Sequence, residues 1–129
     1  MRRHLAIIKR EYLDLILRGE KTLECRLSRI ACAPYERISV GEEVLLKESS
    51  GPVRGRAQVE QVEFFHGLTP EIIGQIRRQY HHEIKAEPEF WYGRRDCKYG
   101  SLIRLGRIEK IRPYRIKRSG LQAWVVLEE

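Results

Sequence analysis

The fold of this chain is decided by the stretch ILRGEKTLECR, residues 16–26, where a helical pattern changes into a strand pattern. Upstream, apolar residues recur at helical spacing over residues 11–18, and Gly19 is the residue type that most often ends a helix. Downstream, polar and apolar residues alternate over residues 22–27, which is the period of a half-buried strand. The stretch therefore predicts a helix, a turn and a strand in direct succession.

The strand predicted at residues 22–27 has two chemically different faces, because successive side chains of a strand point to opposite sides. The apolar face is expected to contact the core and carries Leu23, Cys25 and Leu27. The polar face is expected to open onto a groove and carries Thr22, Glu24 and Arg26. Lys21 precedes them at the turn, where its ammonium is expected to reach a phosphate as a point charge.

Strand patterns outnumber helical patterns in the rest of the chain. Further strands are expected over residues 5–9, 43–48, 53–65 and 123–127, together with a long strand or hairpin over 99–114, interrupted at Gly106. These segments predict an α+β domain that spans residues 1–129, with a mixed, partly closed β-barrel and two or three flanking helices. A fully antiparallel sandwich is the alternative.

Two helical segments are expected in the second half of the chain. Thr69-Pro70-Glu71 is typical of a helix start, with a capping threonine, proline at the first position and an acid in the first turn. The apolar face of this helix is expected at Ile72, Ile73, Ile76, Tyr80 and Ile84. A shorter helical segment is expected over residues 88–92.

Composition excludes several classes of protein. With 42% hydrophobic and 33% charged residues in 129, the chain resembles a folded domain and not a disordered one. No apolar run approaches the ~20 residues of a membrane span, and no signal-peptide pattern follows the N-terminus. We therefore expect a cytoplasmic protein without a membrane partner.

The cysteines and histidines give no sign of a metal site. Three cysteines are an odd number, none forms a CxxC pair, and the four histidines show no ligand spacing with them. Reduced thiols in the cytosol are the favoured interpretation, although a Cys25–Cys32 bridge stays open. We expect neither a metal nor any other cofactor.

The positive charge of the chain is concentrated near its C-terminus. The net charge is +7, and the stretch from Arg94 to Arg118 alone carries +8, with only Asp96 and Glu109 as acids. The basic residues of this stretch are Arg94, Arg95, Lys98, Arg104, Arg107, Lys110, Arg112, Arg115, Lys117 and Arg118. Such an excess is typical of a polyanion site. The alternative is a solvated basic face in which some arginines pair with distant glutamates.

Aromatic residues lie among these cations. Phe90-Trp91-Tyr92 precede Arg94 and Arg95, and Tyr99 follows Lys98. Flat side chains next to cations are what single-stranded bases stack on. We expect Tyr92 or Tyr99 to be exposed, and Trp124 to belong to the core because it lies in an apolar run.

The central stretch resembles the signature of the ASCH family, a helix ending in glycine followed by x-Lys-x-x-Glu-x-Arg. Gly19, Lys21, Glu24 and Arg26 match it. Residues 40–46 resemble the family's next strand entry, and residues 99–103 resemble its closing strands. The resemblance implies a PUA-like barrel with a cleft beside the motif and nucleic-acid binding as the commonest proposed role. A few relatives are enzymes, either amidohydrolases that remove an acyl group from a modified cytidine or proteins reported to cut RNA.

The motif residues have plausible roles at such a cleft. Arg26 offers a planar fork for a phosphate or a base edge. Glu24 can fix Arg26 by an ion pair or accept a hydrogen bond from a base amino group. In the alternative interpretation, Glu24 and Arg26 form an internal pair that merely closes the mouth of the barrel.

The amidohydrolase relatives use a lysine and a threonine in this segment. Lys21 matches their lysine, but Glu24 stands where the resemblance places their threonine, so the hydroxyl nucleophile is missing. RNA cleavage with Lys21 and Glu24 as acid and base remains an alternative, as does a protein-interaction role.

The favoured prediction is therefore a module that binds nucleic acid, with single-stranded or structured RNA as the partner. Its predicted contacts are Lys21, Thr22, Glu24, Arg26, Tyr92, Arg94, Arg95, Lys98 and Tyr99.

Overall fold

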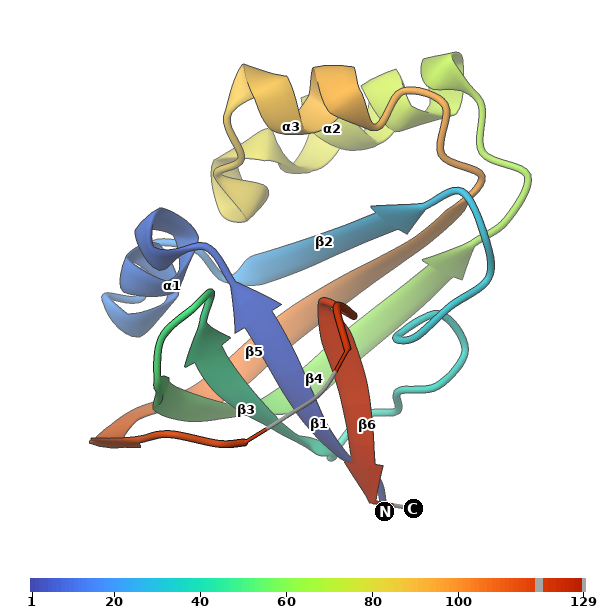
Figure 1. The fold of residues 1–129 in the computed structure, drawn as a ribbon. Coiled ribbons are helices and arrows are strands. Elements are labelled where there is room, and N and C mark those ends of the chain that lie inside the picture. Colours follow the sequence, from blue (N-terminus) through green and yellow to red (C-terminus); the bar gives the residue numbers. More distant parts are fainter. Residues whose placement is uncertain (118–119, 129) are drawn as a thin grey trace.

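The computed structural model describes residues 1–117 and 120–128, which form one six-stranded sheet and three helices (Figure 1). The strands are β1 (Arg3–Ile8), β2 (Leu23–Ser28), β3 (Glu43–Glu48), β4 (Val53–Phe65), β5 (Tyr99–Tyr114) and β6 (Trp124–Glu128). The helices are α1 (Arg10–Leu17), α2 (Pro70–Ile84) and α3 (Pro88–Gly93). The predicted α+β class is confirmed.

The sheet is mixed and curls into a half-barrel. Its strand order is β2-β5-β4-β3-β1-β6, so β2 and β6 are the two edges. β1 pairs with β3 in parallel, and every other described pairing is antiparallel. Figure 1 shows β2 facing β1 and β6 across the open side of the curled sheet. A mixed, partly closed barrel is thus confirmed, and the alternative of a fully antiparallel sandwich is wrong.

The turn after α1 places the motif at one edge of this opening. Gly19 has φ +78°, in the left-handed region that glycine adopts without steric cost. The backbone N–H groups of Glu20 and Lys21 both donate to the Leu15 carbonyl, at 2.9 and 3.1 Å, so the chain turns tightly over the end of the helix. β2 then begins at Leu23, one residue later than the alternation predicts.

Two apolar clusters lie on opposite sides of β2. One fills the inside of the curled sheet, where Leu13 and Ile16 of α1 are fully buried. The other lies between the sheet and helices α2 and α3, and it contains Leu23 and Cys25 as predicted. The polar face of β2 therefore points toward the inside of the half-barrel, at its open side.

Some details differ from the sequence-based expectations. Ile72 is 37% exposed, so the buried face of α2 is narrower than its apolar residues suggest. Residues 99–114 form one strand and not a hairpin, and the interruption at Gly106 corresponds to a shift of register against β4. All three cysteines are free, so the possible Cys25–Cys32 bridge is not formed.

Three further expectations can be compared with the described residues. Trp124 is 4% exposed and belongs to the core, and Tyr92 is 71% exposed, both as predicted. Arg118, the last cation of the basic stretch, lies outside the described residues. Within the described ranges, none of the helices combines the length and the apolar character needed to cross a membrane.

Candidate functional site

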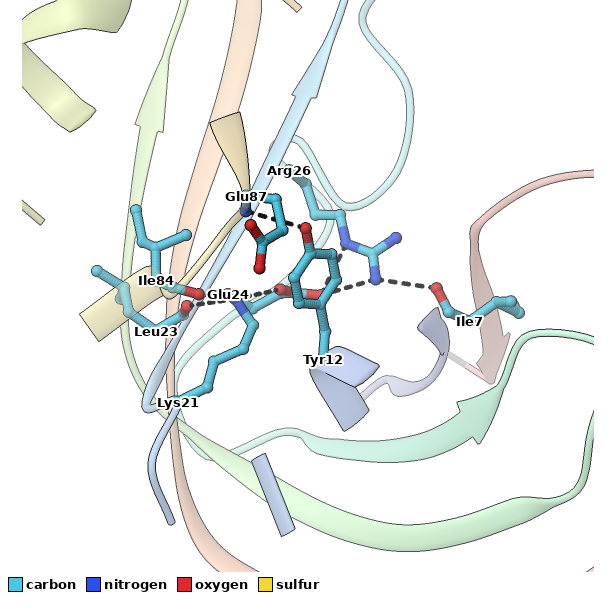
Figure 2. Close-up of polar contacts among 8 residues, drawn as sticks. All are labelled: Ile7, Tyr12, Lys21, Leu23, Glu24, Arg26, Ile84 and Glu87. Atoms are coloured by element: carbon cyan, nitrogen blue, oxygen red, sulfur yellow. Dashed lines mark hydrogen bonds and ion pairs between the residues drawn. The ribbon is translucent and has the colours of Figure 1, made fainter. Parts of the chain in front are cut away.

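A deep cleft occupies the open side of the half-barrel, between β2 on one edge and β1 with the start of β6 on the other. Its volume is about 1130 Å³, at or slightly above the upper end of typical ligand pockets. α1 and the segment between α2 and α3 also contribute to its walls. Figure 2 shows the polar groups on the floor of this cleft.

Lys21 is buried at this floor and not extended toward solvent. Its side chain is 3% exposed, and its ammonium donates to the backbone carbonyls of Leu23 (3.2 Å) and Ile84. The Glu24 carboxylate, 3.3 Å away, is the third acceptor (Figure 2). Because an ammonium has three donors, Lys21 has no donor left for a phosphate.

Arg26 links the two edges of the sheet. Its guanidinium donates from Nε (3.1 Å) and Nη2 (2.8 Å) to Oε2 of Glu24 on the same strand. It also donates to the carbonyl of Ile7 in β1 and to that of Ala123 just before β6, both at 3.1 Å. The Cζ atom of the guanidinium lies over the Trp124 ring, 5.1 Å from its centre. This is the internal Glu24–Arg26 pair at the barrel mouth that the sequence left as an alternative.

Glu24 is the buried anion that holds both cations. Burial by itself would raise the pKa of its carboxyl group, but the charges of Arg26 and Lys21 outweigh that effect and hold the pKa below the usual value. Cys25, the next residue, behaves in the opposite way. Burial raises the pKa of the Cys25 thiol to about 12, so it stays protonated at neutral pH and is a poor nucleophile.

Ser101 is a cleft residue that the sequence analysis missed. It lies on β5 directly opposite Arg26, is 1% exposed, and lines the cleft. Its hydroxyl has no hydrogen-bond partner among the described residues, and no other buried side-chain group of these residues is unpartnered. An unpaired buried hydroxyl costs about 1–3 kcal/mol, so Ser101 is a position where a bound polar group would be favoured. A serine between glycine and two large aliphatic residues is the only sequence signal.

Trp124 forms one wall of the cleft, and a hydrogen bond to buried His4 fixes the position of its ring. Its indole N–H donates to Nδ1 of His4 at 3.0 Å, while Nε2 of His4 lies 2.8 Å from the Glu42 carboxylate. Because an indole N–H can only donate, Nδ1 must accept, and the imidazole proton is on Nε2. Hydrogen bonds from His4 and from two backbone N–H groups overcome the effect of burial and lower the pKa of Glu42. The wall is therefore rigidly placed.

Tyr35 and Phe90 add further flat groups to the cleft lining. Tyr35 packs edge-on against Tyr99, with ring centres 5.1 Å apart. Arg94 also lines the cleft and lies over the Phe90 ring at 4.1 Å. The described cleft lining thus contains aromatic faces and a partly exposed cation.

The remaining predicted site residues lie outside the cleft. Thr22 does not line it; its backbone pairs with Glu83 and Leu105. Tyr92 and Arg95 form an exposed stacked pair at the end of α3, with the guanidinium 4.2 Å from the ring centre. Lys98 is exposed on the approach to β5.

The basic stretch does not form a single patch. Arg94 lines the cleft, whereas Arg104, Arg107, Lys110 and Arg112 are distributed over nine residues of β5, roughly 25 Å of extended strand. Arg104 is compensated by Glu83, with the charged atoms 2.6 Å apart. The sequence concentrates charge along the chain, but the fold separates it in space.

Solved structures with a similar fold include proteins from Zymomonas mobilis and Staphylothermus marinus. ASCH from Zymomonas mobilis matches with a TM-score of 0.75 and 15% sequence identity, over 98% of this chain and 87% of that chain. A variant of the same protein with a tyrosine replaced by phenylalanine matches with a TM-score of 0.76 and 15% identity, over 99% of this chain and 91% of that one. The N-terminal domain of Staphylothermus marinus McrB matches with a TM-score of 0.51 and 14% sequence identity, over 88% of this chain and 76% of that chain. No family model matches the sequence, and no curated protein matches it significantly.

Proposed function

Because the chain has the fold of an ASCH domain, we propose that it is a nucleic-acid-binding module with single-stranded RNA as its partner. One unpaired base enters the cleft, and the sugar-phosphate backbone stays outside. The observation that carries this proposal is the Ser101 hydroxyl, which is buried, unpartnered among the described residues and located on the cleft wall.

The lining of the cleft suits a base better than a phosphate. A hydroxyl can donate to or accept from a base edge, and Tyr35, Trp124 and the Arg26 plane supply flat surfaces. On the cleft floor a phosphate would need free cationic donors, but all three donors of Lys21 and four of the five N–H groups of Arg26 already bond to Glu24 or backbone carbonyls. Five basic and four acidic side chains line the cleft, so its net positive charge is small.

The same groups favour binding over catalysis. The Lys21 ammonium is saturated with acceptors, whereas a general base needs a free lone pair facing the substrate. Ser101 has no described hydrogen-bond partner, so no base activates its hydroxyl as a nucleophile. Cys25 is held as a neutral thiol. The alternative of an enzyme acting on RNA or a modified nucleoside therefore receives no support from the cleft residues.

Residues around the cleft would contact the strand where it leaves. Arg94 lies at the cleft wall, next to the exposed stack of Arg95 on Tyr92. A planar cation on an aromatic ring is a suitable platform for a second base. Lys98 and Tyr99 are further candidates on the same approach, while Thr22 is not part of the proposed interface.

Replacement of Ser101 by alanine tests the proposal. Ser101→Ala removes the only unpaired buried hydroxyl of the described residues, so binding of labelled RNA is expected to weaken by about 5–10-fold, the value of one hydrogen bond. The loss should differ among oligonucleotides of different base, since base contacts specify sequence. Ser39→Ala, at an exposed serine outside the cleft, is the matched control. Fluorescence anisotropy with RNA and DNA versions of each oligonucleotide is the measurement. Equal affinities for wild type and Ser101→Ala would contradict it.

A further inference from the structure

A second hollow lies on the helical layer, outside the cleft. It measures about 430 Å³ and is lined by Arg77, Arg78, His81, Ala86, Pro88 and Trp91. We call it the α2–α3 hollow. It is absent from the sequence analysis because its two arginines precede the basic stretch and sit within a helix.

The two arginines of the α2–α3 hollow have no ion-pair partner among the residues that the structure describes. Both are exposed, and the structure describes no hydrogen bond or ion pair for either guanidinium. Arg77 does lie over the ring of Trp91, 6.0 Å from its centre, and Trp91 is 4% exposed. One guanidinium is thus placed by a buried aromatic ring while its N–H groups remain available. Planar guanidinium groups of this kind bind phosphate in a two-pronged geometry.

The α2–α3 hollow adjoins the cleft. Ala86, between α2 and α3, lines both. Its neighbours are fixed to the cleft floor, because the Ile84 carbonyl accepts from Lys21 and the Glu87 N–H donates to the Tyr12 hydroxyl (3.1 Å, Figure 2). The segment over residues 84–87 is therefore a fixed ridge with the cleft on one side and the two arginines on the other.

The charged side chains that residues 87–89 present to the cleft are opposite in sign to the two arginines of the hollow, although the cleft lining as a whole has five basic and four acidic side chains. Glu87 and Glu89 line the cleft side and disfavour a phosphate there. Arg77 and Arg78 line the other side. A strand with an uncharged base in the cleft would thus have its phosphates drawn across the ridge.

From this arrangement we propose that the α2–α3 hollow binds the phosphate backbone of the nucleotides next to the base held in the cleft. The partner is one single strand of nucleic acid that crosses the ridge at Ala86. The inference rests on the proposed function of the cleft. It adds the path of the nucleic-acid strand outside the cleft and the two arginines that bind its phosphates.

A charge-matched comparison of two double variants tests this path. Arg77→Gln with Arg78→Gln removes the hollow's cations, whereas Lys110→Gln with Arg112→Gln removes two exposed cations on the far part of β5. Affinity for a labelled RNA octamer is measured by anisotropy over a salt series. For single strands each phosphate contact contributes about 0.7 to the slope of log affinity against log salt. The hollow variant should therefore lose about 1.4 from the slope, and the β5 variant should change little.

Length dependence gives a second readout. Wild-type affinity should rise as the oligonucleotide grows from two to eight nucleotides, and the hollow variant should lose most of that gain while binding the dinucleotide normally. The single variant Arg78→Gln, which leaves the Arg77–Trp91 contact intact, should show about half the change in slope.

The outcomes separate the two proposals. An unchanged slope in the hollow variant, or an equal loss in both double variants, overturns this path while leaving binding at the cleft in place. Failure of the wild-type protein to bind any oligonucleotide at low salt overturns the proposed function, and this path with it.

Discussion

At the scale of single residues, Glu24 determines the character of the cleft floor. It is the one carboxylate shared by Lys21 and Arg26, and all three are largely buried. A buried ion pair is costly to break because the remaining charge stays without a partner. Glu24 therefore acts as an anchor for two cations.

The first prediction is that Glu24→Gln destabilises the fold strongly. The substitution keeps the shape but leaves two cations facing each other, so the free energy of unfolding should fall by about 3–5 kcal/mol. Urea denaturation is the measurement. Glu109→Gln, which removes the exposed partner of Arg56, is the control and should cost about 0–1 kcal/mol. A small effect of Glu24→Gln would contradict the anchoring role.

The pH dependence of stability follows from the same carboxyl group. The pKa of Glu24 is lower in the folded protein than its ordinary value of 4.5. Its contribution is therefore complete above pH 4.5 and is lost as the pH falls through the depressed folded pKa. Glu42 also contributes stability that is lost at low pH, because its pKa is lowered in the folded protein as well. Wild type should lose stability below pH 4.5 more steeply than Glu24→Gln, and parallel curves would argue against this assignment.

At the scale of elements, the helix–turn–strand unit depends on Gly19. Its φ of +78° strains any residue with a Cβ, although no atom lies within 4 Å of the position a Cβ would take. Gly19→Ala should therefore cost about 1–2 kcal/mol through backbone strain alone. Gly93→Ala, where the space is equally open and φ is not positive, is the control and should be neutral or slightly stabilising. Thermal unfolding of both variants is the measurement. Equal melting temperatures for Gly19→Ala and Gly93→Ala would rule out the strain argument.

The elements were predictable where their signals are local. The strands at residues 43–48 and 53–65 were expected with the bounds that the structure has, because the turn residues 49–52 mark the end of one and the start of the other. Thr69 was expected to cap α2, and its hydroxyl accepts from the Ile72 N–H. The order of the strands in the sheet has no such signal, since it depends on pairings between distant segments.

The site was predictable only in part, for the same reason. The strand alternation correctly placed Glu24 and Arg26 on one face, where their side chains form an ion pair at 2.8 Å. The environment of Lys21, however, depends on the Ile84 carbonyl, 63 residues away, and that of Arg26 on the Ala123 carbonyl, 97 residues away. Whether the Ser101 hydroxyl has a hydrogen-bond partner depends on the positions of the side chains around it in the fold. Sequence spacing contains none of this information.

At the scale of the whole molecule, the Arg26 side chain bridges the open side of the half-barrel, where no backbone pairing joins the sheet edges β2 and β6. It is the link from β2 to the carbonyls of Ile7 and Ala123 near the opposite edge. Arg26→Lys keeps the charge next to Glu24 but loses the rigid fork that reaches both carbonyls. We expect faster hydrogen exchange in β6, on the order of tenfold, with β4 and β5 unchanged. Exchange rates in β6 equal to those of wild type would show that the edges are held by other contacts.

The central claim, that a nucleic acid enters the cleft, is tested most directly by the indole N–H signals in a nitrogen–proton correlation spectrum. The chain has two tryptophans: Trp124 lines the cleft and Trp91 lines the α2–α3 hollow. On titration with a short single-stranded RNA at low salt, the Trp124 signal should shift in a saturable way, because its ring forms the cleft wall and its N–H is bonded to His4. A Trp124 signal that stays in place at saturating RNA would contradict the account.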